Sequence, residues 1–138
     1  MQEAQLLTNG NCACSLEDCS TQVGGTLQNV SKNDTGVKEA VLTGTDSFNN
    51  KSNDAFLFRA SAVDEAKRQI VKGIRYILEV EISRTVCRKR SNTDLDNCPF
   101  QTDRLLQQTF FCHFDVWSIP WMKKMSTTDF ECRSNEIF

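Results

Sequence analysis

The sequence predicts an α+β fold in which one long helix packs across a curved antiparallel sheet. One segment with helical periodicity is followed by three segments in which apolar and polar residues alternate with period two. A chain of 138 residues is long enough for one domain with its own core. Four C-terminal cysteines read as two disulfides, Cys87–Cys98 and Cys112–Cys132. Each should stabilise the fold by about 3 kcal/mol in the chain-entropy model.

The helix is predicted to begin after Asn33 or Asp34, either of which is a suitable N-cap. Its apolar positions fall close to one face of a 3.6-residue spiral and are Val37, Ala40, Val41 and Phe48. Asn49-Asn50 marks the expected end. Gly44 lies between two threonines, and because glycine is a poor helix former we expect a helix weaker than usual.

Three later segments are predicted strands, since residues on one face of a strand recur at every second position. In the first strand the residues expected to share a face are Phe56, Phe58, Ala60 and Ala62. In the second they are Ile74, Tyr76, Leu78, Val80 and Ile82. In the third they are Phe110, Cys112, Phe114 and Val116. A helix followed by such strands predicts the α+β class.

Composition excludes several classes of function. A net charge of −2 and a pI near 5.4 provide no basic field, so nucleic acid is not an expected partner. No apolar run reaches the roughly 18 residues that a membrane span needs. Residues 1–21 are polar and aperiodic, which predicts a loosely structured extension before a folded domain at 22–138.

The cysteines and three glycosylation sequons indicate an oxidising, secretory setting. The sequon asparagines are Asn29, Asn33 and Asn50, all within one polar stretch. The segment Met1–Leu7 lacks the charged and apolar regions of a signal peptide, so if the protein is secreted we expect its signal to have been removed or to lie outside this sequence. The expected location is extracellular, with an endolysosomal compartment as the alternative.

Residues 69–73, Gln-Ile-Val-Lys-Gly, join two predicted strands and should form a hairpin tip. Gly73 suits a positive φ at this tip, and Lys72 suits water. Val71 is an apolar, β-branched residue at an exposed turn, where it is out of place. The alternative is an ordinary hairpin whose apolar residues only end the strands.

Two further stretches are suited to presenting backbone or apolar surface. Pro120 gives a stiff corner, on which Trp121 becomes an anchor for a partner's pocket or, alternatively, folds back over the sheet. The adjacent glycines of Val23-Gly24-Gly25 let the backbone approach a partner closely, or else form a flexible linker. None of the three stretches contains a nucleophile or a metal ligand.

The order and spacing of these stretches resemble the type 2 cystatins, which are secreted inhibitors of papain-like cysteine peptidases. The resemblance runs from about Thr21 to Cys132 and includes segments 84–87 and 95–100 and the spacing of the last four cysteines. It is stronger to the cystatin C and cystatin F branches than to the intracellular stefins, which lack these disulfides.

The resemblance implies a hydrophobic edge that enters the peptidase cleft and blocks substrate access tightly and reversibly, without reacting with the catalytic cysteine. The implied edge consists of Val23 and Gly24, of Gln69, Ile70, Val71, Lys72 and Gly73, and of Pro120 and Trp121. Val23 would occupy the S2 subsite, and Gly24 would act as a hinge. Gln22 stands where strong inhibitors of the family often carry an apolar residue, so we expect a smaller contribution from this trunk.

A second site is implied by Ser52-Asn53-Asp54, which matches the loop through which some family members inhibit legumain, an asparaginyl endopeptidase. The alternative is a helix-ending turn, because all three residues are common in turns. A glycan on Asn50 would obstruct this site.

The oligomeric state is left open between monomer and dimer. Cys12, Cys14 and Cys19 have no counterpart in the two-disulfide pattern, and with seven cysteines at least one is unpaired within a monomer and could join two chains. Domain swapping is the other route to a dimer, favoured by strain at Val71 in the tight first loop.

Two other functions are alternatives to inhibition. One is a secreted binding protein of this fold without inhibitory activity. The other is an enzyme, but His113 is the only histidine, and neighbouring strand residues such as Cys112 point to the opposite face. A zinc site of Cys12, Cys14, Cys19 and His113 is a minor alternative. We therefore expect no catalytic residue, no metal and no cofactor.

Overall fold

A computed structural model of the chain describes residues 25–90 and 94–134. By their contacts these residues form a smaller unit, residues 25–27 with Gln69–Lys72, and a larger unit that contains the rest. The predicted extension over 1–21, with its three cysteines, and the trunk residues Val23 and Gly24 lie outside the described residues. The domain division at residue 22 therefore stays a prediction.

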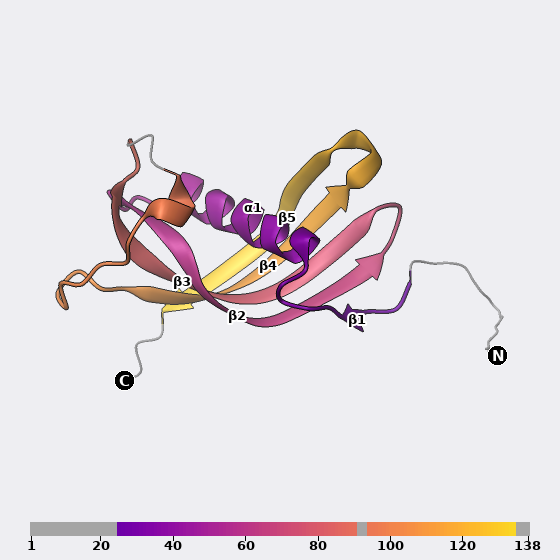
Figure 1. Cartoon of the computed structure of the whole chain (residues 1–138), viewed down its shortest axis with the longest axis horizontal. Coiled ribbons are helices and arrows are strands. Elements are labelled where there is room, and N and C mark those ends of the chain that lie inside the picture. The colour runs from indigo at the N-terminus through magenta and orange to yellow at the C-terminus, as the bar shows by residue number, and fades with distance from the viewer. Residues whose placement is uncertain (1–24, 91–93, 135–138) are drawn as a thin grey trace. The chain divides into compact units, whose positions relative to one another are not determined.

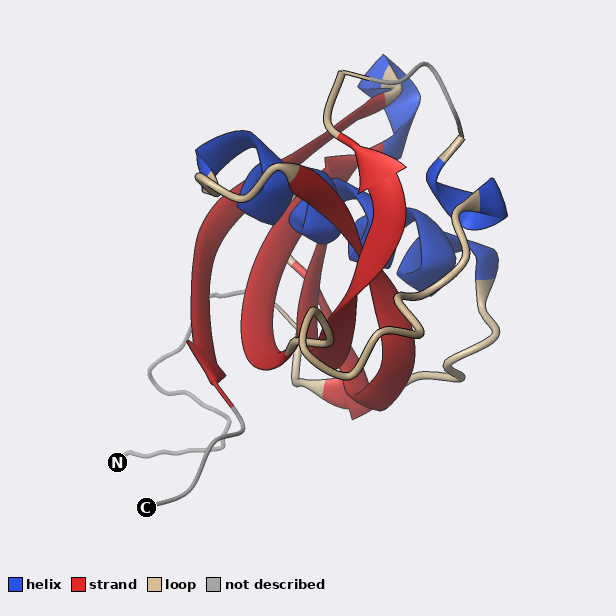
Figure 2. Ribbon diagram, turned by 90° about the vertical axis from the view of Figure 1, so that its left-hand side faces the viewer, coloured by secondary structure: helices blue, strands red, loops and turns tan. Residues whose placement is uncertain are grey.

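The α+β prediction is confirmed, with one helix packed against a five-stranded antiparallel sheet. The strands follow the chain order β1-β2-β3-β4-β5 across the sheet. Helix α1 (Thr35–Lys51) crosses one face of the sheet, and the strands curve around it (Figures 1 and 2). The strands are β1 (Gln28–Asn29), β2 (Phe56–Ile70), β3 (Ile74–Arg88), β4 (Thr109–Ile119) and β5 (Lys124–Ser134).

Helix α1 begins as predicted, with Asp34 as its N-cap. The Val37 N–H donates to the Asp34 carboxylate (3.3 Å), which satisfies one of the free donors of the first turn. The helix ends at Lys51, one residue beyond the predicted Asn49-Asn50.

Asn49 is buried, and its side chain joins α1 to the backbone of β2. Its side-chain amide donates to the Phe58 carbonyl (3.0 Å), and its side-chain oxygen accepts from the Phe58 N–H (2.9 Å). A buried amide with both groups satisfied fixes the last turn of α1 to the start of β2. The sequence did not predict this contact, because the partner is a backbone group nine residues away.

The core lies between α1 and the sheet and confirms the predicted alternation in β3 and β4. Its members on these strands are Tyr76, Leu78, Val80, Ile82, Cys112, Phe114 and Val116, all buried. In β2, Phe58 and Ala60 face the core as predicted, but Ala62 is exposed and Val63 packs against the core in its place. The alternation therefore changes phase after Ala60, as it does at a β-bulge, and the prediction for Ala62 was wrong.

Both predicted disulfides are present. Cys112 and Cys132 are opposite each other on β4 and β5, so this bond links a register pair inside the sheet. Cys87 and Cys98 close the loop that follows β3. Both bonds fit an extracellular protein.

Gly44 is buried where α1 packs closely on β4. A Cβ at this position would lie 2.6 Å from Cγ of Phe114, whose ring is fully buried. Glycine therefore serves the packing of the helix on β4, at the expense of local helix propensity. The residue that lowers the helix propensity, Gly44, is therefore the one that the close approach of α1 to β4 requires.

We predict that Gly44→Ala destabilises the protein by about 1–3 kcal/mol through overpacking against Phe114. Helix propensity alone predicts the opposite sign, a gain of about 1 kcal/mol. Urea unfolding distinguishes the two, with Thr43→Ala on the same helix as the control that leaves the contact intact. An increase in the free energy of unfolding for Gly44→Ala would contradict the account.

Candidate functional site

The first loop forms the predicted hairpin tip between β2 and β3. Ile70, the last residue of β2, is 54% exposed although it is apolar. Gly73 has the predicted positive φ (128°), and Lys72 also lies in the left-handed region (φ 46°). Val71 does not, so the strain predicted at Val71 was assigned to the wrong residue.

Gly73 is required by a close approach between neighbouring strands as well as by its backbone angle. A Cβ here would lie 2.5 Å from the Ser118 carbonyl oxygen and 3.0 Å from Nε1 of Trp117. Any side chain would push the start of β3 away from the end of β4. The glycine therefore fixes the base of the hairpin and leaves contact with a partner to other residues.

Gln69 ties the first loop to the residue that follows the predicted trunk. Its side-chain amide donates to the Gly25 carbonyl (2.7 Å), and the Gly25 N–H donates to the Ile70 carbonyl (2.8 Å). Two hydrogen bonds therefore hold Gly25 beside the loop, within the smaller unit. Sequence reasoning had placed Gln69 among the partner contacts and missed this clamp, because its partner lies 44 residues earlier.

The second loop is a short 3₁₀ turn, Pro120–Met122, between β4 and β5. The Lys123 N–H donates to the Pro120 carbonyl (3.0 Å) and closes the turn. Trp121 is 70% exposed, which excludes the alternative that it folds back over the sheet. Met122 is 51% exposed and was missed by sequence reasoning, although its place directly after Pro-Trp was the available signal.

The loop after α1 holds Asn53 at its tip. Ser52 Oγ accepts the Asp54 N–H (3.0 Å), and Asp54 accepts the Phe56 N–H (2.9 Å). The Asp54 carboxylate also pairs with the Arg84 guanidinium (2.5 Å). Ser52 and Asp54 thus form the helix-ending turn that was the alternative interpretation. Asn53, which lies between them, is exposed.

The sequon asparagines Asn29, Asn33 and Asn50 are all exposed, as a glycan acceptor must be. His113 is a half-exposed strand residue beside Glu79 (Nδ1 to Oε2, 2.5 Å), whereas neighbouring Cys112 is buried in its disulfide. This arrangement excludes a Cys112–His113 catalytic pair. The zinc site with the three N-terminal cysteines lies largely outside the described residues.

Within residues 25–90 and 94–134, no three His, Cys, Asp or Glu side chains gather as they would around a metal ion. In the same part of the chain no helix is both long and apolar enough to span a membrane.

An ion pair links β3 to β4, the strand that leads into the second loop. The Arg75 guanidinium on β3 holds the Asp115 carboxylate on β4 through two nitrogens, the shorter contact being 2.6 Å. The β4–β5 register shifts next to Asp115. The hydrogen bond from Arg75 lowers the pKa of Asp115 against the opposing effect of its burial.

We predict that Asp115→Asn lowers the free energy of unfolding at pH 7 by about 1 kcal/mol, since Asp115 is mostly buried and Arg75 partly exposed. A lowered folded-state pKa gives stability that is present above the unfolded pKa of about 3.9 and lost as pH falls through the folded value. The difference from wild type should therefore narrow below about pH 4. Asp129→Asn, opposite Asp115 on β5, is the control and should not lower stability. A difference in the free energy of unfolding between Asp115→Asn and wild type that does not change with pH would contradict the role given to the Asp115 carboxylate.

Comparison with known proteins identifies the family. A model of the cystatin domain matches residues 25–121. Human cystatin-F is 41% identical over 119 residues, covering 86% of this chain and 82% of the relative. Bovine cystatin-C is 38% identical over 109 residues, covering 79% and 73%. A crystal structure of dimeric human cystatin F superposes with a TM-score of 0.80 at 38% identity, covering 91% of this chain and 98% of that chain.

The chain therefore belongs to the cystatin family. It is an inhibitor of cysteine peptidases and not an enzyme. The resemblance found in the sequence is confirmed, including its similarity to cystatins F and C.

Proposed function

We propose that this protein inhibits papain-like cysteine peptidases of the cathepsin type by filling their active-site cleft, tightly and reversibly. The observation that carries the proposal is the exposure of Trp121 on a turn whose backbone is closed by its own hydrogen bond. Ile70, exposed at the end of β2, gives the first loop a comparable apolar contact. Tryptophan is one of the residues enriched among the hot spots of protein interfaces.

The physical advantage of such loops is that their shape is set before binding. A preformed turn loses little conformational entropy on docking, so that burial of apolar surface is converted efficiently into affinity. Binding of this kind requires no reaction with the catalytic cysteine, and inhibition is reversible.

The trunk is the second part of the proposal. Gly25, the residue that follows Val23 and Gly24 in the chain, is held beside the first loop by Gln69 and Ile70. We propose that Val23 enters the S2 subsite and that Gly24 turns the chain away. Gln22, a polar residue, makes the trunk contribute less than the loops.

We predict that Trp121→Ala weakens inhibition of papain or a cathepsin by about 30- to 1,000-fold, the range of a 2–4 kcal/mol anchor. Gly24→Glu should also weaken it, by placing a carboxylate in the cleft. Leu105→Ala is the matched control, because Leu105 is 93% exposed but lies in the loop before β4, at the other end of that strand from Trp121. Titration of active peptidase gives the inhibition constants.

Inhibition constants unchanged by both Trp121→Ala and Gly24→Glu would rule out the cleft-filling mechanism. No inhibition by the unaltered protein, measured on monomeric and dimeric fractions separately, would favour the alternative of a non-inhibitory secreted binding protein with this fold.

We further propose legumain as a second target, bound through Asn53. The supporting observation is that Ser52 and Asp54 are engaged in the turn and with Arg84, whereas Asn53 is exposed between them. An exposed asparagine on a turn held by hydrogen bonds and an ion pair suits a peptidase that cleaves after asparagine. The site lies at the end of α1, apart in sequence from both hairpin loops.

We predict that Asn53→Ala abolishes inhibition of legumain and leaves inhibition of papain unchanged. Trp121→Ala should weaken inhibition of papain and leave inhibition of legumain unchanged. The two variants are each other's control, because each removes one exposed side chain. Asn50→Gln removes the sequon whose glycan would obstruct the site, and should strengthen legumain inhibition in glycosylated protein. Inhibition of legumain that survives Asn53→Ala would rule out this site.

For assembly and location we propose a secreted or endolysosomal glycoprotein. The supporting observations are the two disulfides and the exposed asparagines at positions 29, 33 and 50. Four of the seven cysteines are paired, which leaves an odd number for the N-terminal segment and one available to join a second chain. Comparing the protein's mass with and without reductant tests this disulfide-linked dimer against a monomer or a domain-swapped dimer.

A further inference from the structure

Two adjacent lysines continue the second loop beyond Trp121. Lys123 and Lys124 are both exposed, and neither takes part in an ion pair within the described part of the chain. With Met122, they place an apolar side chain and two free cations on the four residues that follow Pro120. Such a combination is available to a partner without breaking any internal salt bridge.

The backbone under these side chains is fixed. Lys123 is held in the left-handed region (φ 52°), and its N–H donates to the Pro120 carbonyl. A lysine adopts this conformation only where the surrounding structure imposes it. Lys124 is the first residue of β5 and is paired in register with Ile119. The backbone positions from which both lysine side chains extend are therefore set before binding.

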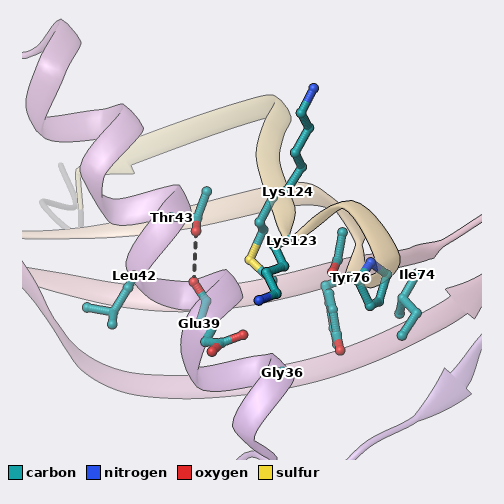
Figure 3. Close-up of a pocket in the computed structure, with 11 residues that line it drawn as sticks. Gly36, Glu39, Leu42, Thr43, Ile74, Tyr76, Lys123 and Lys124 are labelled. Atoms are coloured by element: carbon teal, nitrogen blue, oxygen red, sulfur yellow. Dashed lines mark hydrogen bonds between the residues drawn. The ribbon is translucent and has the colours of Figure 1, made fainter.

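The lysine side chains extend over open space. They line a groove of about 620 Å³ between α1 and the β4–β5 hairpin, and extend in opposite directions (Figure 3). Among the residues that line this groove, Glu39 on α1 is the single acidic side chain. With two lysines and one carboxylate, the charged side chains that line the groove are net positive.

We propose that Met122, Lys123 and Lys124 form a selectivity element that favours peptidases with an acidic surface beside the place where the second loop docks. The inference rests on the proposed cleft-filling function and names the class of peptidase that it prefers. Aspartate and glutamate side chains on the peptidase are the groups recognised. Complementary charge at the rim of an interface acts mainly by speeding association, whereas buried apolar contacts slow dissociation.

The test compares Lys123→Gln, Lys124→Gln and the double variant by stopped-flow association with an acidic-surfaced and a neutral-surfaced cathepsin. For the acidic target at low salt, each single variant should slow association by about 2- to 5-fold, since steering by charge is strongest there. At about 0.5 M salt the rates should converge, because screening then acts within about 5 Å. Met122→Ala should instead speed dissociation, with little dependence on salt.

Arg104→Gln is the matched control, since it removes one exposed positive charge in the loop before β4. It is separated from Lys123 by the eleven residues of β4, or about 35 Å of strand, well beyond the screening length. Equal slowing by Arg104→Gln and Lys123→Gln, or equal effects on both peptidases, would overturn the selectivity element. Retained sensitivity to Trp121→Ala in that case would leave the cleft-filling function intact.

Discussion

The close contact between α1 and β4 at Gly44 and Phe114 sets the geometry on which the larger unit depends. Because no Cβ intervenes, the helix lies close to the sheet, and a single layer of apolar side chains fills the space between them. Strands of eleven to fifteen residues curve around the helix and continue past this core. The residues that connect β4 to β5 are exposed, and the apolar side chain of Trp121 is available to a partner.

Some residues of the family motifs hold the loops in shape, and others are exposed for contact with a partner. Gln69 holds Gly25, and Gly73 permits β3 to approach Ser118, so both act within the protein. Ile70 is the exposed apolar member of the same loop. The loop after α1 repeats the arrangement, since Ser52 and Asp54 are engaged and Asn53 is presented. Polar residues in these loops thus determine the shape in which the exposed ones meet a target.

Much of this could be read from the sequence, because local patterns report local structure. The helix start at Asp34 and the alternation in β3 and β4 follow from capping and periodicity. For Trp121 the sequence left two alternatives, and the structure decides for exposure. The sequence could not show partners distant along the chain. The phase change before Val63, the Asn49 clamp on Phe58 and the Gln69 clamp on Gly25 all depend on where the sheet brings segments together. Gly44 was interpreted as a weakness for the same reason, since its partner Phe114 lies on another element.

The central claim is that inhibition comes from occupying a cleft with preformed loops, without chemistry at the peptidase cysteine. Its most direct test is the affinity of the protein for papain whose catalytic cysteine carries a small alkyl group, measured beside the unmodified peptidase. The account predicts that the modified peptidase is still bound tightly, with at most a modest loss from crowding near the cysteine. Complete loss of binding to the alkylated form, or a covalent adduct with the free form, would contradict it.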